Sequence, residues 1–317
     1  MSTLRRLAVI TTVTTYLLVS VGGMVRATES GLGCPDWPRC HGSLIPPFEY
    51  HALIEYSHRL IASVVIFLTL ALAAVAIARR SQIERRARRL AIATVPVVFS
   101  QALLGALVVA LELHAESVVA HLLVALSLFA ILISLVIETT PSVPAPGEAP
   151  ADRDFARRLT WVTVSTLALM LLGSYVSGRD AGLAFPDWPL FDGRILPATH
   201  GVLPDLHFAH RVLAAAVSVA VFALARSVRR RAQAAPVNVL VRIASAVIGI
   251  EILVGAGNVW TKLSPVTRTA HLALGALVFG ALFAATRLAW RLPSPSGAEH
   301  APVPEPEPDH AHVGSPA

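Results

Sequence analysis

Charged residues are scarce in this chain: Asp, Glu, Lys and Arg make up 15% of its 317 residues, whereas hydrophobic residues make up 55%. Soluble domains carry about 25% charged residues. The composition therefore excludes an ordinary soluble domain and indicates a protein of the lipid bilayer.

Cysteine is scarcer still, with Cys34 and Cys40 alone in the chain and five residues between them. Covalent attachment of a c-type haem needs Cys-x-x-Cys-His, so it is excluded. A zinc site built from these cysteines and His41 would lack a fourth ligand. Within the apolar segments Glu-x-x-His occurs once, at Glu55–His58, whereas a di-iron carboxylate bundle needs it on two helices.

Long apolar runs dominate what is present. Crossing a bilayer takes roughly 20 helical residues at a rise of about 1.5 Å each. Eight runs are long enough, at about residues 7–25, 52–78, 90–111, 118–138, 158–176, 207–225, 237–258 and 268–290. The sequence predicts an all-α polytopic membrane protein with eight transmembrane helices. The first run is long and no small-residue cleavage site follows it, so we expect a retained helix rather than a signal peptide.

Basic residues predict the orientation. With eight spans both termini share one side of the membrane, and that side holds 18 of the 26 Lys and Arg residues, many of them in the segments 79–89 and 226–231. By the positive-inside rule this side is cytoplasmic, which predicts a multi-pass plasma-membrane protein. The net charge of +6 follows from this bias and does not indicate a nucleic-acid partner.

The chain repeats itself after about 150 residues. SGLGCPDWPRC matches AGLAFPDWPLF, SHRLIAS matches AHRVLAA, QALLGALVV matches EILVGAGNV, and AHLLVALSLFA matches AHLALGALVFG. We predict two parallel four-helix bundles, an N-terminal half (1–138) and a C-terminal half (157–291). A Pro-rich cytoplasmic linker (139–156) joins them, and a disordered cytoplasmic tail (292–317) follows.

Four histidines hold matched positions in the repeat: His58, His121, His210 and His271. They precede the cytoplasmic ends of their helices by 16 to 21 residues, which places them roughly 24–32 Å away, near the extracytoplasmic edge. Two histidines at one depth can bind a haem iron from both faces, so the pattern predicts two tetrapyrrole sites. Interhelical hydrogen bonding is the structural alternative.

Polar residues beside these histidines are partly shared and partly different. Arg59 and Arg211 occur in both halves, either to pair with haem propionates or to extend to the membrane surface. Glu55 lies one turn before His58 on the same helix face, but His207 stands at the matching place. Only the N-terminal half thus offers a candidate acid or base, although a helix N-terminus would also favour this carboxylate.

The repeated loops differ in the same way, since Phe185 and Phe191 stand where the first loop has Cys34 and Cys40. On the extracytoplasmic side two cysteines favour a disulfide, which either closes the loop or cycles between redox states. The PDWP residues common to both loops are interpreted as a structural cover for the bundle mouth.

Four features carry a resemblance to a known family: eight spans in a four-plus-four repeat, one histidine on each even-numbered helix, and the segments EYSHR and CPDWPRC. Over residues 7–290 the chain resembles the haem A synthase family of the Cox15/CtaA type. That family oxidises a porphyrin methyl group of haem O to a formyl group through hydroxylated intermediates, giving haem A for cytochrome oxidase. The resemblance implies haem O synthase (protohaem farnesyltransferase) as substrate donor. The cysteine pair is similar to that of one branch of the family.

Carried over residue by residue, the resemblance implies that His210 and His271 ligate haem b. It implies that His58 and His121 hold haem O, with Glu55 as the catalytic carboxylate. We hypothesise that Glu55 manages protons near the substrate methyl group while haem b passes electrons onward.

Two other classes explain part of the pattern. A di-haem b-type cytochrome that transfers electrons from quinol explains the four histidines but gives Glu55 and the cysteines no role. A repeat transporter should have helices broken near the middle of the membrane. The candidate breaks here are few and poorly matched between the halves: Pro96, Gly105, Gly249, Gly255 and Gly257.

Overall fold

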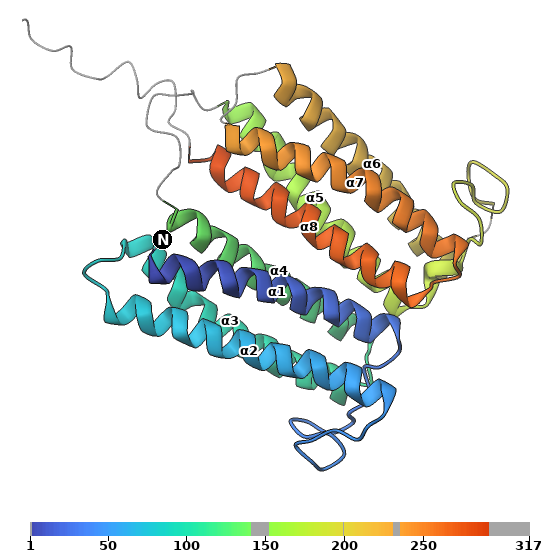
Figure 1. Cartoon of the computed structure of the whole chain (residues 1–317). Helices are drawn as coiled ribbons and strands as arrows, with labels where there is room; N and C mark the ends of the chain where they lie inside the picture. The colour runs from blue at the N-terminus through green and yellow to red at the C-terminus, as the bar shows by residue number, and fades with distance from the viewer. Residues whose placement is uncertain (1, 141–151, 199, 231–234, 292–317) are drawn as a thin grey trace, which may run out of the picture.

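In the computed structural model, residues 2–140, 152–198, 200–230 and 235–291 are described. Eight long helices make up most of them (Figure 1): α1 (Thr3–Ala27), α2 (Tyr50–Ala78), α3 (Arg85–Ala110), α4 (Ala115–Glu138), α5 (Arg153–Gly178), α6 (Val202–Arg230), α7 (Ala235–Trp260) and α8 (Pro265–Ala289). Each is long and apolar enough to span a membrane. The predicted all-α membrane protein with eight spans is confirmed. A short 3₁₀ turn, η1 (Ala181–Leu183), precedes α6.

Every helix begins before the apolar run that predicted it. The helix α3 begins at Arg85 rather than near residue 90, because arginine has a high helix propensity and extends the helix past its apolar part. The helix α5 begins inside the predicted linker 139–156, where the side chain of Asp152 accepts the N–H of Phe155 at 2.9 Å as an N-cap. Residues 141–151 of that linker and the predicted tail 292–317 lie outside the described residues.

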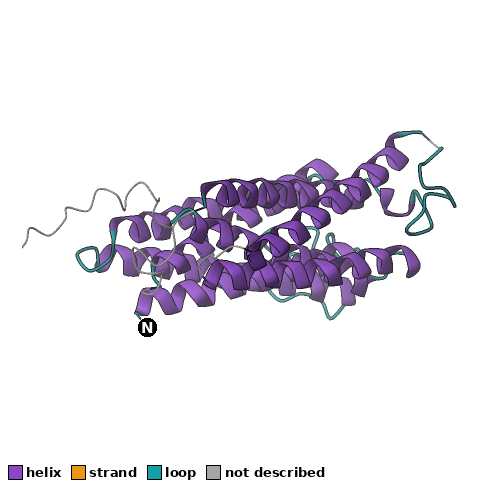
Figure 2. Ribbon diagram, turned by 90° about the horizontal axis from the view of Figure 1, so that it is seen from above, coloured by secondary structure: helices purple, strands orange, loops and turns teal. Residues whose placement is uncertain are grey.

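Consecutive helices pack against one another within each half, and in each half the first helix also contacts the fourth. Helices α1 to α4 lie together on one side and α5 to α8 on the other (Figure 1). Contacts of α1 with α8, and of α4 with α5 and α8, join the two groups. Seen from above, the helices run side by side along one direction (Figure 2). The division into two repeated bundles stays a prediction.

Among the described residues, the three larger clusters of buried apolar side chains are one core in each group of helices and a third between the groups. Leu72 and Leu132 lie in the first core, Leu159 and Leu282 in the second, and Phe129 is among the residues of α1, α4 and α8 that form the third. The third core fixes the two groups against each other, because its apolar side chains come from helices of both halves.

At the end of the molecule that holds the N-terminus, a buried carboxylate joins the two groups of helices through ion pairs. The side chain of Glu138 is fully buried, and its Oε1 lies 3.1 Å from Nε of Arg86 and 3.2 Å from Nη2 of Arg287. Its Oε2 bonds to Arg291. These contacts tie α3 and α4 to the end of α8. The long loops after α1 and α5 lie at the opposite end (Figure 1).

Candidate functional site

The four matched histidines lie near the end of the molecule that carries the two long loops. His58 and His210 come eight residues after the first residue of α2 and α6, and His121 and His271 come six residues after the first residue of α4 and α8. At 1.5 Å per residue they lie about 9–12 Å inside the helix ends. The repeat therefore places both pairs at similar depths.

His210 and His271 face each other across the C-terminal half. Their ring centroids are 6.4 Å apart and the ring planes meet at 77°. A metal–imidazole bond measures about 2.0 Å. If one iron atom bonds to both rings, the distance between the ring centroids is the sum of the two bonds and of the distance from each bonding nitrogen to the centre of its ring. This sum is close to the observed separation of the centroids. One iron atom fits between these two histidines.

His58 on α2 and His121 on α4 form the corresponding pair in the N-terminal half. Within the described residues, Nδ1 of each of the four matched histidines is buried without a hydrogen-bond partner. A buried polar atom without a partner is costly and calls for an explanation. Interhelical hydrogen bonding between side chains, the structural alternative, is seen for His121, whose Nε2 lies 3.1 Å from Nε2 of Gln101.

A glycine on the preceding helix lies against each of the four rings, and each glycine stands five residues before the end of its helix. A Cβ atom there would lie 2.9 to 3.3 Å from Cε1 of the ring, whereas nonbonded carbons settle at about 3.5–4.0 Å. The pairs are Gly22 with His58, Gly105 with His121, Gly173 with His210, and Gly255 with His271. Glycine therefore leaves room for the ring at these positions, whereas a larger residue would require the ring to shift.

The sequence interpretation missed this role. From the sequence, Gly105 and Gly255 are candidates only for breaks in transporter helices, and these candidates match poorly between the halves. The sequence does contain a signal for their role. Both glycines end the aligned segments QALLG and EILVG, and in both halves a histidine follows on the next helix. Gln101 and Glu251, four residues earlier, were missed as well. Glu251 lies with Oε1 at 3.0 Å from Nδ1 of His271.

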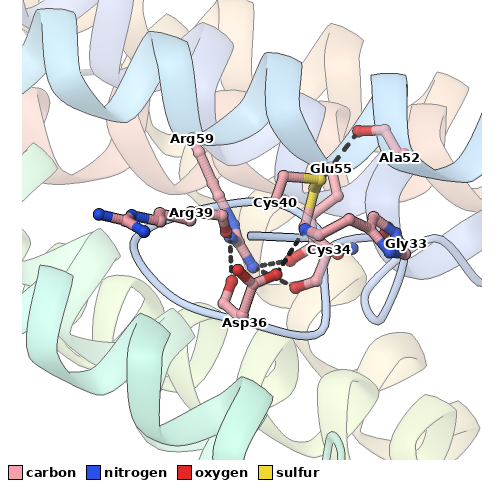
Figure 3. A network of polar contacts seen from close by, with 9 residues as sticks. Gly33, Cys34, Asp36, Arg39, Cys40, Ala52, Glu55 and Arg59 are labelled. Carbon is pink, nitrogen blue, oxygen red and sulfur yellow. Dashed lines mark hydrogen bonds and ion pairs between the residues drawn. A yellow bond between two sulfur atoms is a disulfide. The ribbon is translucent and has the colours of Figure 1, made fainter. Parts of the chain in front are cut away.

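Glu55 is buried and is held by the first loop (Figure 3). Its Oε2 accepts the backbone N–H of Cys34 at 2.8 Å, and its Oε1 lies 2.5 Å from Nη2 of Arg59. The first turn of α2 holds no acidic residue, since Glu55 comes later. The helix N-terminus therefore does not explain this carboxylate, and its partners are the loop and one arginine.

The arginines that follow His58 and His210 fasten the loops to the helices. Arg59 donates to three loop carbonyl oxygens at 2.7–2.8 Å, and Arg211 donates to two at 2.9 and 3.2 Å. The acceptors are the carbonyl groups of Cys34, Asp36 and Arg39 in the first loop and of Phe185 and Leu190 in the second. No contact in the structure tests the predicted pairing with propionates, which stays a prediction.

The PDWP residues build the same turn in both loops. The carboxylate of Asp36 accepts the N–H groups of His41 and Gly42 at 2.6 and 2.8 Å, and that of Asp187 accepts two N–H groups at 2.8 and 2.7 Å. The backbone N–H groups of Gly42 and Gly193 lower the pKa of Asp36 and Asp187, respectively, because they stabilise the charged form. The Trp–Pro bond is cis in both loops.

The loops differ where they meet the helix. Cys34 and Cys40 form the predicted disulfide, with Cα atoms 4.6 Å apart. In the second loop the rings of Phe185 and Phe191 pack edge to face at 5.1 Å. His207 accepts the N–H of Phe185 at 3.3 Å. In the first half the carboxylate of Glu55 accepts the N–H of Cys34 at the matching place. One scaffold thus carries a carboxylate and a disulfide in one half, and an imidazole and two phenyl rings in the other.

The donor set fits a haem. Among the described residues no group of three or more His, Cys, Asp or Glu side chains could hold a metal ion. A site with two protein ligands completes an iron atom's coordination when a porphyrin supplies the other ligands. The facing histidine pair and the glycines that leave room for the rings agree with such a group.

Comparisons with known proteins point to one family. The family described as "Cytochrome oxidase assembly protein" (COX15-CtaA) matches residues 5–52 and 47–283. A protein named "Heme A synthase" from Symbiobacterium thermophilum is 32% identical over 241 residues, 73% of this chain and 77% of its own. Another of that name from Bacillus pumilus is 29% identical over 292 residues, 88% and 92% of the two chains. Because the match spans both groups of helices and all four histidines, this chain belongs to the COX15-CtaA family.

Proposed function

We propose that this protein is a haem A synthase, which oxidises a porphyrin methyl group of haem O to a formyl group through hydroxylated intermediates. The relatives that bear this name support the proposal. The observation that carries it is the difference between the halves: a buried carboxylate at one histidine pair, and His207 at the same place beside the other. An electron-transfer cytochrome has no need of this difference.

In this proposal the C-terminal half binds haem b through His210 and His271. The N-terminal half binds the substrate, haem O, through His58 and His121. Haem b supplies one-electron redox chemistry when bound. The glycines and the packed helices orient the imidazole rings before either group enters.

Glu55 is the acid or base of the reaction. Converting a methyl group to a formyl group removes hydrogen and supplies oxygen, so a group that takes up protons is needed close to the methyl carbon. The N–H of Cys34 and the guanidinium of Arg59 hold the carboxylate in one orientation. The disulfide-closed loop covers this end of α2 and helps to exclude water.

We further propose that both termini are cytoplasmic and that the histidine pairs lie toward the extracytoplasmic side. The excess of arginine at the opposite end supports this orientation. Haem O is large and poorly soluble, so direct transfer from haem O synthase (protohaem farnesyltransferase) fits the chemistry, and haem A then serves the assembly of cytochrome oxidase.

The test is to extract the pigments of the purified protein, produced alongside a source of haem O, and to identify them by chromatography and mass. We expect haem A or its hydroxylated precursor together with haem b. Protohaem alone, at two per chain, would instead identify a di-haem electron-transfer cytochrome.

Gly173→Ala is expected to weaken haem b binding. Its Cβ would lie 2.9 Å from Cε1 of His210, and overpacking costs about 1–3 kcal/mol, equal to a roughly 5- to 150-fold loss of affinity. The measurement is haem b per chain, with its absorption spectrum. Gly249→Ala is the control, because no atom lies within 4 Å of its added Cβ. Equal haem content and spectra in the two variants would contradict the role of Gly173.

A further inference from the structure

We infer that Glu251 is a positioning residue that sets the strength of the His271 ligand and lowers the reduction potential of the iron bound there. Gln101 holds the same place in the N-terminal half without the charge. The inference rests on the proposed function, since it takes haem b to lie between His210 and His271.

Glu251 contacts the histidine from the neighbouring helix. Its Oε1 lies 3.0 Å from Nδ1 of His271, and its side chain is 13% exposed. This approach is a charge contact and not a hydrogen bond, since neither Nδ1 of His271 nor Oε2 of Glu251 has a hydrogen-bond partner among the described residues. A carboxylate is costly in a membrane helix, so the contact calls for a role. With Nδ1 turned to the carboxylate and Cε1 against Gly255, the remaining ring nitrogen, Nε2, is left for iron.

The repeat supplies an internal comparison. Gln101 on α3 and Glu251 on α7 each stand four residues before the glycine that faces the same histidine, so in each helix both residues share one face. Gln101 has its Nε2 at 3.1 Å from Nε2 of His121. The two halves therefore place a polar side chain against the histidine of the next helix. They differ in its charge and in the ring nitrogen that it approaches, which is Nδ1 of His271 but Nε2 of His121.

The charge has a defined effect on a ligating histidine. A carboxylate that accepts from the second ring nitrogen makes the imidazole a stronger electron donor. A stronger donor stabilises oxidised iron, which lowers the reduction potential and tightens ligation. Glu251 thus suits a haem that stays bound, and the N-terminal half has a neutral amide, Gln101, at the matching place.

Redox titration of haem b in the full-length protein tests this, with Glu251→Gln as the main variant because it keeps the size of the side chain. We expect the ratio of oxidised to reduced haem b at a fixed potential to fall about tenfold, a rise in midpoint of about 59 mV for a one-electron couple. Glu116→Gln is the matched control, since Glu116 is an exposed carboxylate on α4 that accepts from the hydroxyl group of Tyr175. Its midpoint should equal that of the unmodified protein.

Glu251→Asp separates charge from packing. It should retain haem and stay closer to the original midpoint than Glu251→Gln. The inference is wrong if Glu251→Gln leaves the midpoint unchanged, if Glu116→Gln shifts it equally, or if Glu251→Asp shifts it as far. Loss of haem from Glu251→Gln alone supports a ligand-strengthening role, whereas loss from both Glu251 variants makes the residue structural. Absence of haem b from the unmodified protein would count against the proposed function instead.

Discussion

Glu55→Gln should leave both haems bound and reduce haem A formation at least about 100-fold, the lower range of what a positioned acid or base contributes. Glutamine keeps the shape of the side chain and an oxygen to accept the N–H of Cys34, so the loop should stay in place. It cannot take up a proton as a carboxylate does. The measurement is the amount of haem A and hydroxylated precursor extracted per chain, with haem b as the internal reference.

The repeat supplies the control for this variant. His207 occupies the place of Glu55 in the C-terminal half and accepts the N–H of Phe185 in the same way. His207→Gln should keep haem A formation within a few-fold of the unmodified protein, since we assign His207 no chemistry. Normal product from Glu55→Gln would remove the carboxylate from the mechanism. Equal losses in both variants would mean that loop anchoring, and not acid–base chemistry, is what the position contributes.

The sequence predicted the spans well because membrane helices are defined by long apolar runs, which can be read directly. It predicted their ends less well. The first turn of α3 is rich in arginine, and α5 begins with Arg153 and Asp154. Nothing in an apolar pattern shows that a charged segment continues the helix. The N-cap Asp152 sits within a Pro-rich segment whose composition suggested a linker.

The site shows a similar limit. The histidines, Glu55 and the cysteines are reactive residue types at repeated places, so they could be singled out from the sequence. The glycines at positions 22, 105, 173 and 255 have no side chain to attract notice, and their role appears only when two helices pack at a given depth. The partners of Arg59 depend on how the first loop folds back over α2, which residue spacing does not define.

His210→Ala should lower haem b in the purified protein at least about tenfold, because it removes one of two ligands and leaves an apolar gap beside Gly173. His58→Ala should retain haem b and lose haem O and its products instead. The exposed His114 at the start of α4 serves as control, since its ring lies against the carbonyl group of Leu111. Retention of haem b by His210→Ala, together with its loss from His58→Ala, would reverse the assignment of the two halves. The carboxylate at position 55 would then lie beside the resident haem, where acid–base chemistry on a substrate methyl group has no place.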